Sequence, residues 1–223
     1  MSIDRRMEIR AELQKVFPDF PCFFGYDFLP DLKAVIASGK PFIYADHAYF
    51  RRGYEHQNFR VLLSDIHQRK LIPRDTAKTF IYEGRDWRKG SDILIFPPSK
   101  TIAQTFDADG WVEETKAEIR KHTDRRIVVK FKYTPEPLKH FLKTAHAVIG
   151  YGTVATVEAA LYGVPVFAGP RCPATPIAAT DLSQIESPLT PDREPWFRSL
   201  TWSQFHISEI RSGLCRETLL GAH

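Results

Sequence analysis

One stretch of the sequence, AHAVIGYGTVATVEAALYGVPVFA at residues 145–168, restricts the fold more than any other part of the chain. It combines a short apolar run, a glycine turn, a helix-forming segment that ends at Gly163, and a second apolar run. Two buried strands joined by one helix form the repeating unit of a parallel sheet. The stretch therefore predicts an α/β fold with strands at 147–151 and 164–169.

The same alternation extends upstream. The runs DILIFPP (92–98) and RIVVKFKY (126–133) are short, apolar and rich in β-branched residues, as buried strands are. Between the strands, Asp109 predicts the start of one helix and Pro135 the start of another. Four strands with three intervening helices predict a Rossmann-like, doubly wound parallel sheet in the second half of the chain.

The first half of the chain is less regular. Helices are predicted at 3–16 and 30–38, and strands at 21–26, 41–46, 59–63 and 79–83. The order strand, helix, strand over residues 21–46 predicts a second, smaller α/β unit, also with a doubly wound, Rossmann-like parallel sheet. We therefore expect a small N-terminal α/β domain at 1–88, a Rossmann-like domain at 89–200, and a C-terminal helix at 201–223 that packs back on the sheet.

The composition is that of a globular protein. A chain of 223 residues, 43% of them hydrophobic, is long enough for one large core or two small ones. No window approaches the roughly 18 uninterrupted apolar residues of a membrane helix. The first 17 residues mix charged and apolar side chains, unlike a signal peptide. These features predict a cytoplasmic protein with no membrane partner.

The cysteines and histidines follow no metal-site pattern. The three cysteines lie far apart and form no CxxC pair, so we interpret them as buried or unused thiols. They are Cys22, Cys172 and Cys215. A metal site built from Asp46, His47 and His56 would match no known ligand spacing. We therefore expect no metal and no cofactor.

Positive charge is concentrated in two segments, although the formal net charge is only +4. Residues 51–90 contain ten basic and five acidic side chains, and residues 116–143 contain nine basic and three acidic ones. Such segments are typical of surfaces that bind phosphates or nucleic acid, and also of a well-hydrated protein face. Over residues 49–87 aromatic residues alternate with arginines, which would suit a polynucleotide or the phosphates of a smaller ligand.

The turn and helix start at 150–158 carry residues that simple packing does not require. In an open parallel sheet, ligands bind at the carboxyl ends of the strands, where helix N-termini offer N–H groups. Gly152 would let a phosphate approach the backbone, and Thr153 and Thr156 would donate hydrogen bonds to it. Glu158 lies too deep in the helix for a capping box with Thr153, so it would accept from the hydroxyls of a ribose. The alternative is a capped helix with one dipole-stabilised glutamate.

With these residues, IGYGTVATVEAALYGVPVF resembles the nucleotide-sugar-binding segment of GT-B-fold glycosyltransferases. Capsule polysaccharide transferases and nucleotide-sugar 2-epimerases are relatives of that family with a similar segment. The resemblance covers residues 90–169. It implies that Thr153 and Thr156 bind the diphosphate of a nucleotide sugar and that Glu158 binds its ribose.

The preceding strand fits the resemblance with one departure. Several of these families place a basic residue and a histidine near the phosphates, and here Lys132 stands where the histidine is expected. Lys130 and Lys132 would help to neutralise the leaving diphosphate. A GT-B enzyme has two Rossmann-like halves, so the first half of this chain would be a reduced acceptor domain, unless the protein lacks one. The whole chain also resembles phage and prophage proteins described as glycosyltransferases, which would place it in a host cytoplasm.

An inverting transferase needs a general base beside the acceptor hydroxyl. Asp46 and His47 come at the carboxyl end of the strand predicted at 41–46, where α/β folds keep reactive groups. Asp27 follows the strand predicted at 21–26 in an equivalent position. We predict Asp46 as the base, with His47 and Asp27 as alternatives, and each of them could instead be a turn or cap residue.

Arg51 and Arg52 are the predicted phosphate contacts of the first half, because a guanidinium can bind a phosphate through two parallel hydrogen bonds. The sequence thus predicts a metal-independent glycosyltransferase with a nucleotide-diphosphate sugar as donor. The acceptor hydroxyl would belong to a modified base in phage DNA or to a glycan. One alternative is an epimerase or hydrolase that uses the same donor pocket. The other is a non-catalytic module that binds a nucleotide or nucleic acid.

Overall fold

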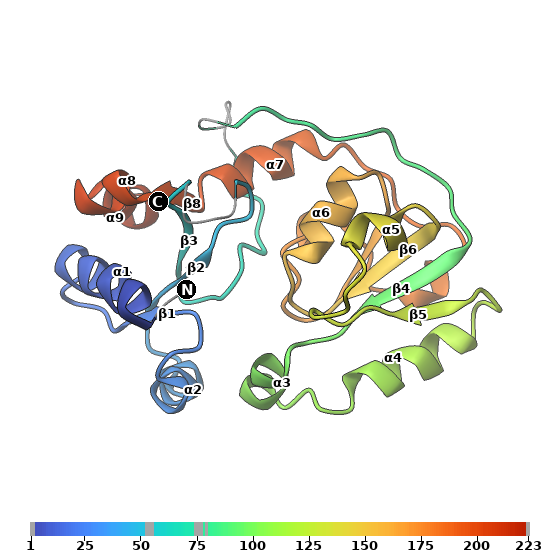
Figure 1. The fold of residues 1–223 in the computed structure, drawn as a ribbon, viewed down its shortest axis with the longest axis horizontal. Helices are drawn as coiled ribbons and strands as arrows, with labels where there is room; N and C mark the ends of the chain where they lie inside the picture. The colour runs from blue at the N-terminus through green and yellow to red at the C-terminus, as the bar shows by residue number, and fades with distance from the viewer. Residues whose placement is uncertain (1–2, 52–55, 74–77, 79, 222–223) are drawn as a thin grey trace. The chain divides into compact units, whose positions relative to one another are not determined.

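The computed structural model describes residues 3–51, 56–73, 78 and 80–221. They fold into two compact units (Figure 1). The mixed-sheet unit contains Met1–Gln68, Pro73–Phe80 and Phe197–His223, and the parallel-sheet unit contains Arg69–Ile72 and Ile81–Trp196. The chain therefore leaves the first unit and later returns to it, whereas the sequence predicted the successive parts 1–88, 89–200 and 201–223.

The parallel-sheet unit alternates strands and helices. Its elements are β4 (Asp92–Phe96), α3 (Lys100–Phe106), α4 (Trp111–Arg120), β5 (Ile127–Val129), α5 (Leu138–Leu142), β6 (Ala145–Gly150), α6 (Ala155–Leu161), β7 (Val166–Ala168) and two short 3₁₀ helices, Thr175–Ile177 and Leu182–Gln184. Helix α7 (Glu194–Thr201) begins in this unit and ends in the other. The sequence did not predict α3, which Ser99 caps by accepting from Ile102 N at 3.3 Å. Helix α4 begins after Gly110, so Asp109 is not its cap.

All four strands of this unit run parallel, in the order β5-β4-β6-β7. The order confirms the predicted α/β class and the parallel sheet. Strand β4 lies in the middle and is buried at every residue, as a near-continuous apolar run should be. The chain passes from β4 to β5 on one side and then crosses to β6 on the other. The direction of winding therefore changes between β4 and β6.

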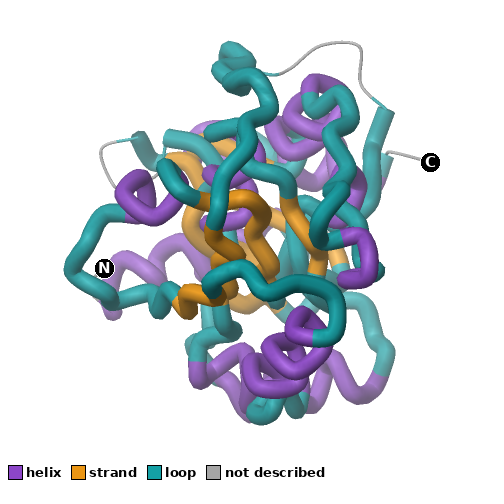
Figure 2. The backbone as a smooth tube through the Cα atoms, turned by 90° about the vertical axis from the view of Figure 1, so that its right-hand side faces the viewer, coloured by secondary structure: helices purple, strands orange, loops and turns teal. Residues whose placement is uncertain are grey.

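Helices cover both faces of this sheet. Figure 1 places α4 and α6 on opposite sides of the strands. Figure 2 traces the same backbone with strands in orange and helices in purple. On the α4 side, Ile119 packs with Ile93 and Ile95 of β4 and Ile149 of β6. On the other side, α6 packs against β6 and β7. Because both faces are covered by apolar contacts, the ends of the strands are where polar side chains can gather.

The mixed-sheet unit is built from both ends of the chain. Its elements are α1 (Ile3–Val16), β1 (Cys22–Phe24), α2 (Leu29–Ser38), β2 (Ile43–His47), β3 (Asn58–Leu63), β8 (Gln204–His206), α8 (Ile207–Arg211) and α9 (Leu214–Leu220). The helices predicted at 3–16 and 30–38 are confirmed. So are the strands within 21–26, 41–46 and 59–63. Helix α2 ends at Gly39, whose φ of 67° suits a glycine C-cap.

The sheet of this unit has the order β1-β2-β3-β8. Strands β1 and β2 are parallel, as the β-α-β pattern predicted, but β3 runs antiparallel to both of its neighbours. The prediction of a doubly wound parallel sheet is therefore wrong for the first half of the chain. A parallel return needs a crossover of about a dozen residues or more, usually a helix. The connection from His47 to Asn58 is shorter than that.

The C-terminal segment completes the mixed-sheet unit. Strand β8 pairs with β3, with Phe205 opposite Phe59, and α8 follows at once with a capping box between His206 and Glu209. Helices α1, α8 and α9 pack on this sheet and on one another. The single helix predicted at 201–223 is thus a strand and two helices, because the chain first adds an edge to the sheet.

The strand predicted at 79–83 is not formed. Thr79 lies outside the described residues, and Phe80–Glu83 has no regular structure. Phe80 packs against the ring of Phe50, with 5.8 Å between the ring centroids, while Ile81 is 79% exposed. The described residues 80–83 therefore do not join either sheet as a strand.

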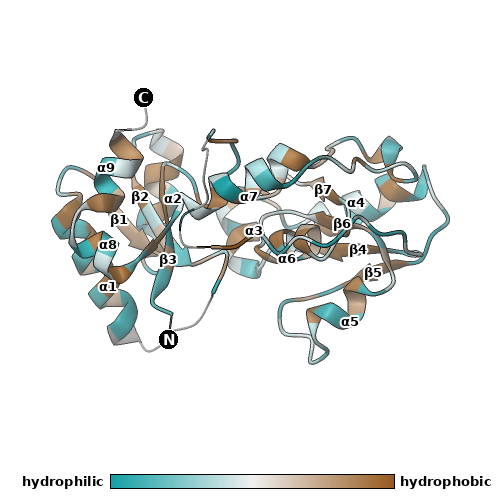
Figure 3. Ribbon diagram, turned by 90° about the horizontal axis from the view of Figure 1, so that it is seen from above, coloured by the Kyte–Doolittle hydropathy of each residue, from teal (hydrophilic) through white to brown (hydrophobic). Residues whose placement is uncertain are grey.

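Figure 3 shows hydrophilic and hydrophobic residues mixed along the helices. Among the helices of the described residues, none combines the length and the apolar character that a bilayer-spanning segment requires.

Candidate functional site

The candidate site lies at the carboxyl edge of the parallel sheet. Strands β4 and β6 are neighbours there, and the chain leaves them in opposite directions, which is where open parallel sheets bind ligands. The residues Pro97–Ser99 follow β4, and the turn Tyr151–Val154 leads from β6 into α6. Strand β7 ends beside them and continues into Gly169–Cys172.

Thr156 is fully buried and supports this turn from inside. Its Oγ1 donates to the carbonyl oxygen of Thr153 at 2.7 Å and accepts from Cys172 Sγ at 3.4 Å. Its methyl group covers Gly150, where a Cβ atom would lie 2.2 Å from Thr156 Cγ2. The hydroxyl that the sequence assigned to a diphosphate is therefore held inside the protein.

Position 152 requires a glycine because the segment around Arg171 packs closely against it. Arg171 N donates to the carbonyl oxygen of Tyr151 at 2.9 Å, and Gly169 N donates to that of Gly150 at 2.9 Å. A Cβ atom at Gly152 would lie 2.9 Å from Arg171 Cβ. The segment after β7 thus occupies the space beside Gly152 that the sequence had assigned to a phosphate.

Thr153 is the predicted residue that stays at the edge of the sheet. It is half-buried, and its Oγ1 accepts from Ala155 N at 3.2 Å, so it stabilises the turn just before α6. That bond uses a lone pair and leaves the hydroxyl hydrogen able to reach a ligand. Glu158 is also half-buried, and its N–H donates to Val154 O at 3.2 Å in the first turn of α6.

A group of aromatic and charged side chains at the same edge was missed by sequence reasoning. The ring of Tyr151 meets Trp111 edge-on, with 5.4 Å between the centroids, and the Arg171 guanidinium lies 4.3 Å from the centroid of Phe106. Burial raises the pKa of Tyr151; Arg171 opposes this and Asp107 adds to it, so both charges lie near the phenol. Arg171 could have been found from its position in the sequence, because it follows the carboxyl end of β7 in the segment GPRC.

The two predicted lysines belong to a turn after β5. Lys130 Nζ donates to the carbonyl oxygens of Phe131 at 3.1 Å and Thr134 at 3.2 Å, so its ammonium organises that turn. Lys132 is exposed, and its Nζ lies 5.6 Å from the centroid of the Tyr133 ring.

Asp46, the predicted base, is part of an ion pair in the mixed-sheet unit. Its Oδ2 accepts from Arg60 Nη2 at 2.6 Å and from Tyr44 Oη at 3.2 Å, and its Oδ1 accepts from His47 N at 2.7 Å. Burial alone would raise the pKa of Asp46, but Arg60 and these hydrogen bonds outweigh it and hold the pKa below its usual range. A carboxylate so stabilised as an anion is a weak proton acceptor.

Arg60 is the buried centre of that arrangement. The residue is only 4% exposed, and besides Asp46 it donates to His47 O at 2.7 Å and to Ile66 O at 3.1 Å. Its guanidinium lies 5.7 Å from the centroid of Tyr44 and 5.8 Å from that of Tyr49. Arg60 therefore holds the end of β2 against β3. The role of Asp46 in this structure is to neutralise the charge of the buried Arg60 guanidinium.

The other predicted residues of this unit are not gathered into one site. His47 is exposed at the end of β2. Asp27 pairs with Arg6 at 2.9 Å. Arg51 is exposed, and its guanidinium lies 5.5 Å from the ring centroid of Phe80. Arg52 lies outside the described residues.

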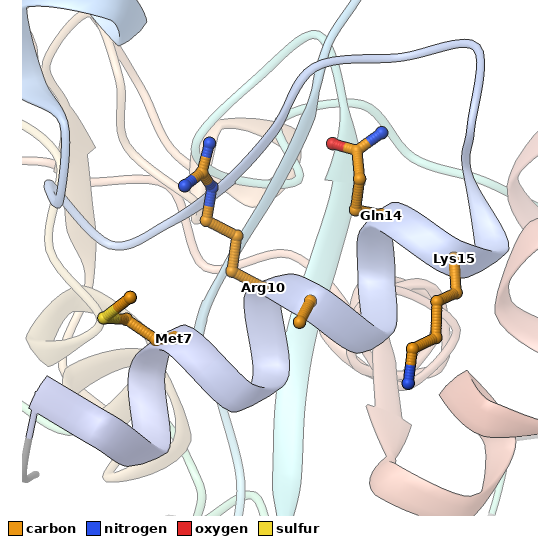
Figure 4. A pocket seen from close by; sticks show the side chains of 5 residues that line it. Met7, Arg10, Gln14 and Lys15 are labelled. Atoms are coloured by element: carbon orange, nitrogen blue, oxygen red, sulfur yellow. The ribbon is translucent and has the colours of Figure 1, made fainter.

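No group of three or more potential metal ligands occurs within the described ranges 3–51, 56–73, 78 and 80–221. A groove of about 480 Å³ runs along α1 and is lined by Met7, Arg10, Ala11, Gln14 and Lys15 (Figure 4). Two of its polar side chains, Arg10 and Gln14, already bind the protein's own backbone. Arg10 Nε donates to Cys22 O at 2.7 Å, and Gln14 Nε2 donates to Phe20 O at 3.1 Å. The groove thus lacks the converging polar groups of a small-molecule site.

No protein-family model matches this sequence, and no curated protein is significantly similar to it. The functional assignment therefore depends on the geometry of the two units.

Proposed function

We propose that the parallel-sheet unit binds the nucleotide diphosphate of a sugar donor at its carboxyl edge, and that the protein transfers the sugar to an acceptor hydroxyl. The observation that carries the proposal is the change of winding direction between β4 and β6. Thr153, Arg171 and the Tyr151–Trp111 pair border that place. Open parallel sheets bind phosphorylated ligands at such switch points.

Each of these side chains suits one part of the donor. The Arg171 guanidinium offers a planar fork for the diphosphate, and the Thr153 hydroxyl can donate to the same group. The aromatic pair offers an apolar surface for the base. Glu158 in α6 remains the proposed acceptor for the ribose hydroxyls. Thr156 and Gly152 shape the turn and contribute indirectly.

The transfer itself needs a proton acceptor. The acceptor oxygen attacks the anomeric carbon, the bond from that carbon to the diphosphate oxygen breaks, and the hydroxyl proton moves to the base. The diphosphate leaves as an anion, which the guanidinium of Arg171 stabilises. Of the two predicted bases, His47 is exposed, whereas the Asp46 carboxylate already accepts three hydrogen bonds, which makes Asp46 the poorer proton acceptor.

A thermal-shift titration tests the donor site. We would compare UDP, GDP, CMP and ADP with their sugar conjugates. At a hundredfold excess over Kd, a ligand of the folded state adds about 2.7 kcal/mol to the free energy of unfolding. We expect one nucleotide series to raise Tm by several degrees, and Arg171→Ala or Thr153→Ala to remove most of the rise. If no nucleotide shifts Tm, the proposed site does not exist.

The matched control is Arg126→Ala. Arg126 precedes β5 at the opposite, amino-terminal edge of the same sheet, and its side chain is 70% exposed and pairs with Asp92. We expect this variant to keep the ligand-induced shift even if its own Tm changes. An equal loss of the shift in Arg126→Ala and Arg171→Ala would mean that charge alone binds the nucleotide.

The transfer step needs a separate assay. We would incubate the protein with the stabilising donor and follow release of the free nucleotide diphosphate, with and without glycan or DNA acceptors. Release that depends on an acceptor and is lost in His47→Ala supports the transferase. Release without an acceptor indicates a hydrolase, and binding without release leaves a nucleotide-binding module.

A further inference from the structure

Two aromatic rings are exposed to water in the turn after β5. Tyr133 is 87% exposed and Phe131 is 59% exposed, although neighbouring apolar residues of the same unit are buried. The residues are separated by one position, and α5 and the loop that leads into it lie away from the strands in Figure 3. An exposed pair of large rings in one short turn is unfavourable in water and commonly marks a binding surface.

The turn is organised without any contribution from the rings. The carbonyl oxygen of Phe131 accepts from Thr134 N at 3.2 Å, from Thr134 Oγ1 at 3.0 Å and from Lys130 Nζ at 3.1 Å. The carbonyl oxygen of Thr134 accepts from the same ammonium at 3.2 Å. Pro135 and Pro137 fix two φ angles in the chain that follows. The backbone therefore holds Phe131 and Tyr133 in water before any partner arrives, which reduces the entropy lost on binding.

The surroundings of the turn are cationic. Lys132, Lys139 and Lys143 are exposed, and Glu136 is the one carboxylate between residues 130 and 143. The first basic segment differs, because several of its cations are already used within the protein. Arg60 is buried in its ion pair with Asp46.

Aromatic faces beside several exposed ammonium groups suit a flexible chain of stackable bases and phosphates. A duplex fits less well, since its bases are already stacked on one another. A lipid surface also fits less well, because membrane-surface segments bury a broad apolar face, whereas here an exposed lysine lies between two rings.

We propose that Phe131 and Tyr133 stack on the bases of a single-stranded nucleic acid whose phosphates lie along Lys132, Lys139 and Lys143. The inference goes beyond the proposed sugar-donor site and does not depend on it. Phe131→Ala/Tyr133→Ala is expected to leave the nucleotide-induced rise in Tm unchanged.

Fluorescence anisotropy with a labelled oligo(dT) strand tests the proposal. We expect the wild type to bind the strand, and Phe131→Ala/Tyr133→Ala to bind it at least roughly tenfold more weakly, because each base–aromatic stack is lost on truncation. The rings are exposed, so the double variant should keep the Tm of the wild type. The control variant is Phe28→Ala, which removes another ring that is 43% exposed.

Two triple lysine-to-alanine variants distinguish binding at this turn from a general attraction of the strand to a basic protein. Lys132→Ala/Lys139→Ala/Lys143→Ala should weaken oligo(dT) binding strongly. Lys100→Ala/Lys116→Ala/Lys121→Ala removes the same charge elsewhere in the same unit and should not.

The proposal is overturned if the wild type does not bind oligo(dT), or if the double aromatic variant binds it as the wild type does. It is also overturned if the two lysine triples weaken binding equally. Vesicles of phosphatidylcholine with phosphatidylserine are the competing probe. Binding to the vesicles with none to oligo(dT) would assign the surface to a membrane instead.

Discussion

Replacing Asp46 by alanine should destabilise the mixed-sheet unit strongly, because the change leaves a buried guanidinium without its counter-ion. Breaking a buried ion pair by removing one partner costs about 3–5 kcal/mol. Two observations favour the lower end of that range. The Asp46 side chain is 20% exposed, and Arg60 keeps two backbone carbonyl oxygens as acceptors. We therefore expect a loss of about 3 kcal/mol in the free energy of unfolding.

Thermal unfolding followed by circular dichroism measures the loss. For a unit of roughly 100 residues, about 3 kcal/mol corresponds to a fall in Tm of about 12 °C or more. The matched control is Asp27→Ala, because the Asp27–Arg6 pair is also close, at 2.9 Å, but both side chains are about a third exposed. Such a pair contributes about 1 kcal/mol or less.

The effect should depend on pH in a defined direction. The folded protein holds the pKa of Asp46 below its ordinary value, so the carboxylate stabilises the fold above the unfolded pKa of about 3.9. That stabilisation is lost as the pH falls through the lower folded pKa. The difference in Tm between wild type and Asp46→Ala should therefore be complete at neutral pH and shrink only in acid.

Equal stability of Asp46→Ala and Asp27→Ala at neutral pH would refute the structural role of Asp46. If Asp46→Ala is inactive but keeps the wild-type Tm, Asp46 acts as the general base instead. The two roles thus predict opposite outcomes in a measurement that needs no substrate.

Two further substitutions and one labelling experiment test the packing of the two units. Gly150→Ala places a Cβ atom 2.2 Å from Thr156 Cγ2 and should cost about 1–3 kcal/mol, measured as a lower midpoint of urea unfolding. Arg193→Met removes a buried guanidinium that binds two backbone carbonyls and lies 3.8 Å from the centroid of Trp87; we expect a loss of about 2–3 kcal/mol, and an unchanged midpoint would contradict it. The cysteines should react with a thiol reagent only after unfolding, because burial raises the pKa of Cys22 and Cys215 to about 12 and of Cys172 to about 11.

The parallel sheet could be predicted because its sequence signals are local. The residues of β4 and β6 form short apolar runs that are buried throughout. Gly163 ends the segment after α6 with a φ of 88°, as a helix-stopping glycine should. The mixed sheet could not be predicted in the same way, because β8 joins β3 across more than a hundred residues. No local pattern specifies such a pairing.

The position of residues 150–158 could be predicted, but their contacts could not. These residues lie at the carboxyl edge because strands joined by crossover helices run parallel and end at the same edge of the sheet. The roles of Gly152 and Thr156 depend on the chain after β7, which passes beside both residues. The sequence gives no register for that passage. A glycine beside a ligand and a glycine beside the protein's own backbone look the same in one sequence.

The net charge of a segment also does not show which of its cations are already paired within the protein. In the segment 51–90, Arg60 and Lys78 are paired with Asp46 and Glu209. A cation already paired with a carboxylate of the protein releases fewer counter-ions when a phosphate approaches, so the net charge of that segment overstates its capacity for nucleic acid.

If Lys132, Lys139 and Lys143 are the main phosphate contacts, the logarithm of the oligo(dT) binding constant should fall with the logarithm of salt concentration with a slope of about −2. Each single lysine-to-alanine change should reduce the steepness of that slope by about 0.7. A slope twice as steep, unaltered by those changes, would show that the segment 51–90 binds the strand instead. That result would mean that its exposed arginines, Arg51 among them, outweigh those held in internal pairs.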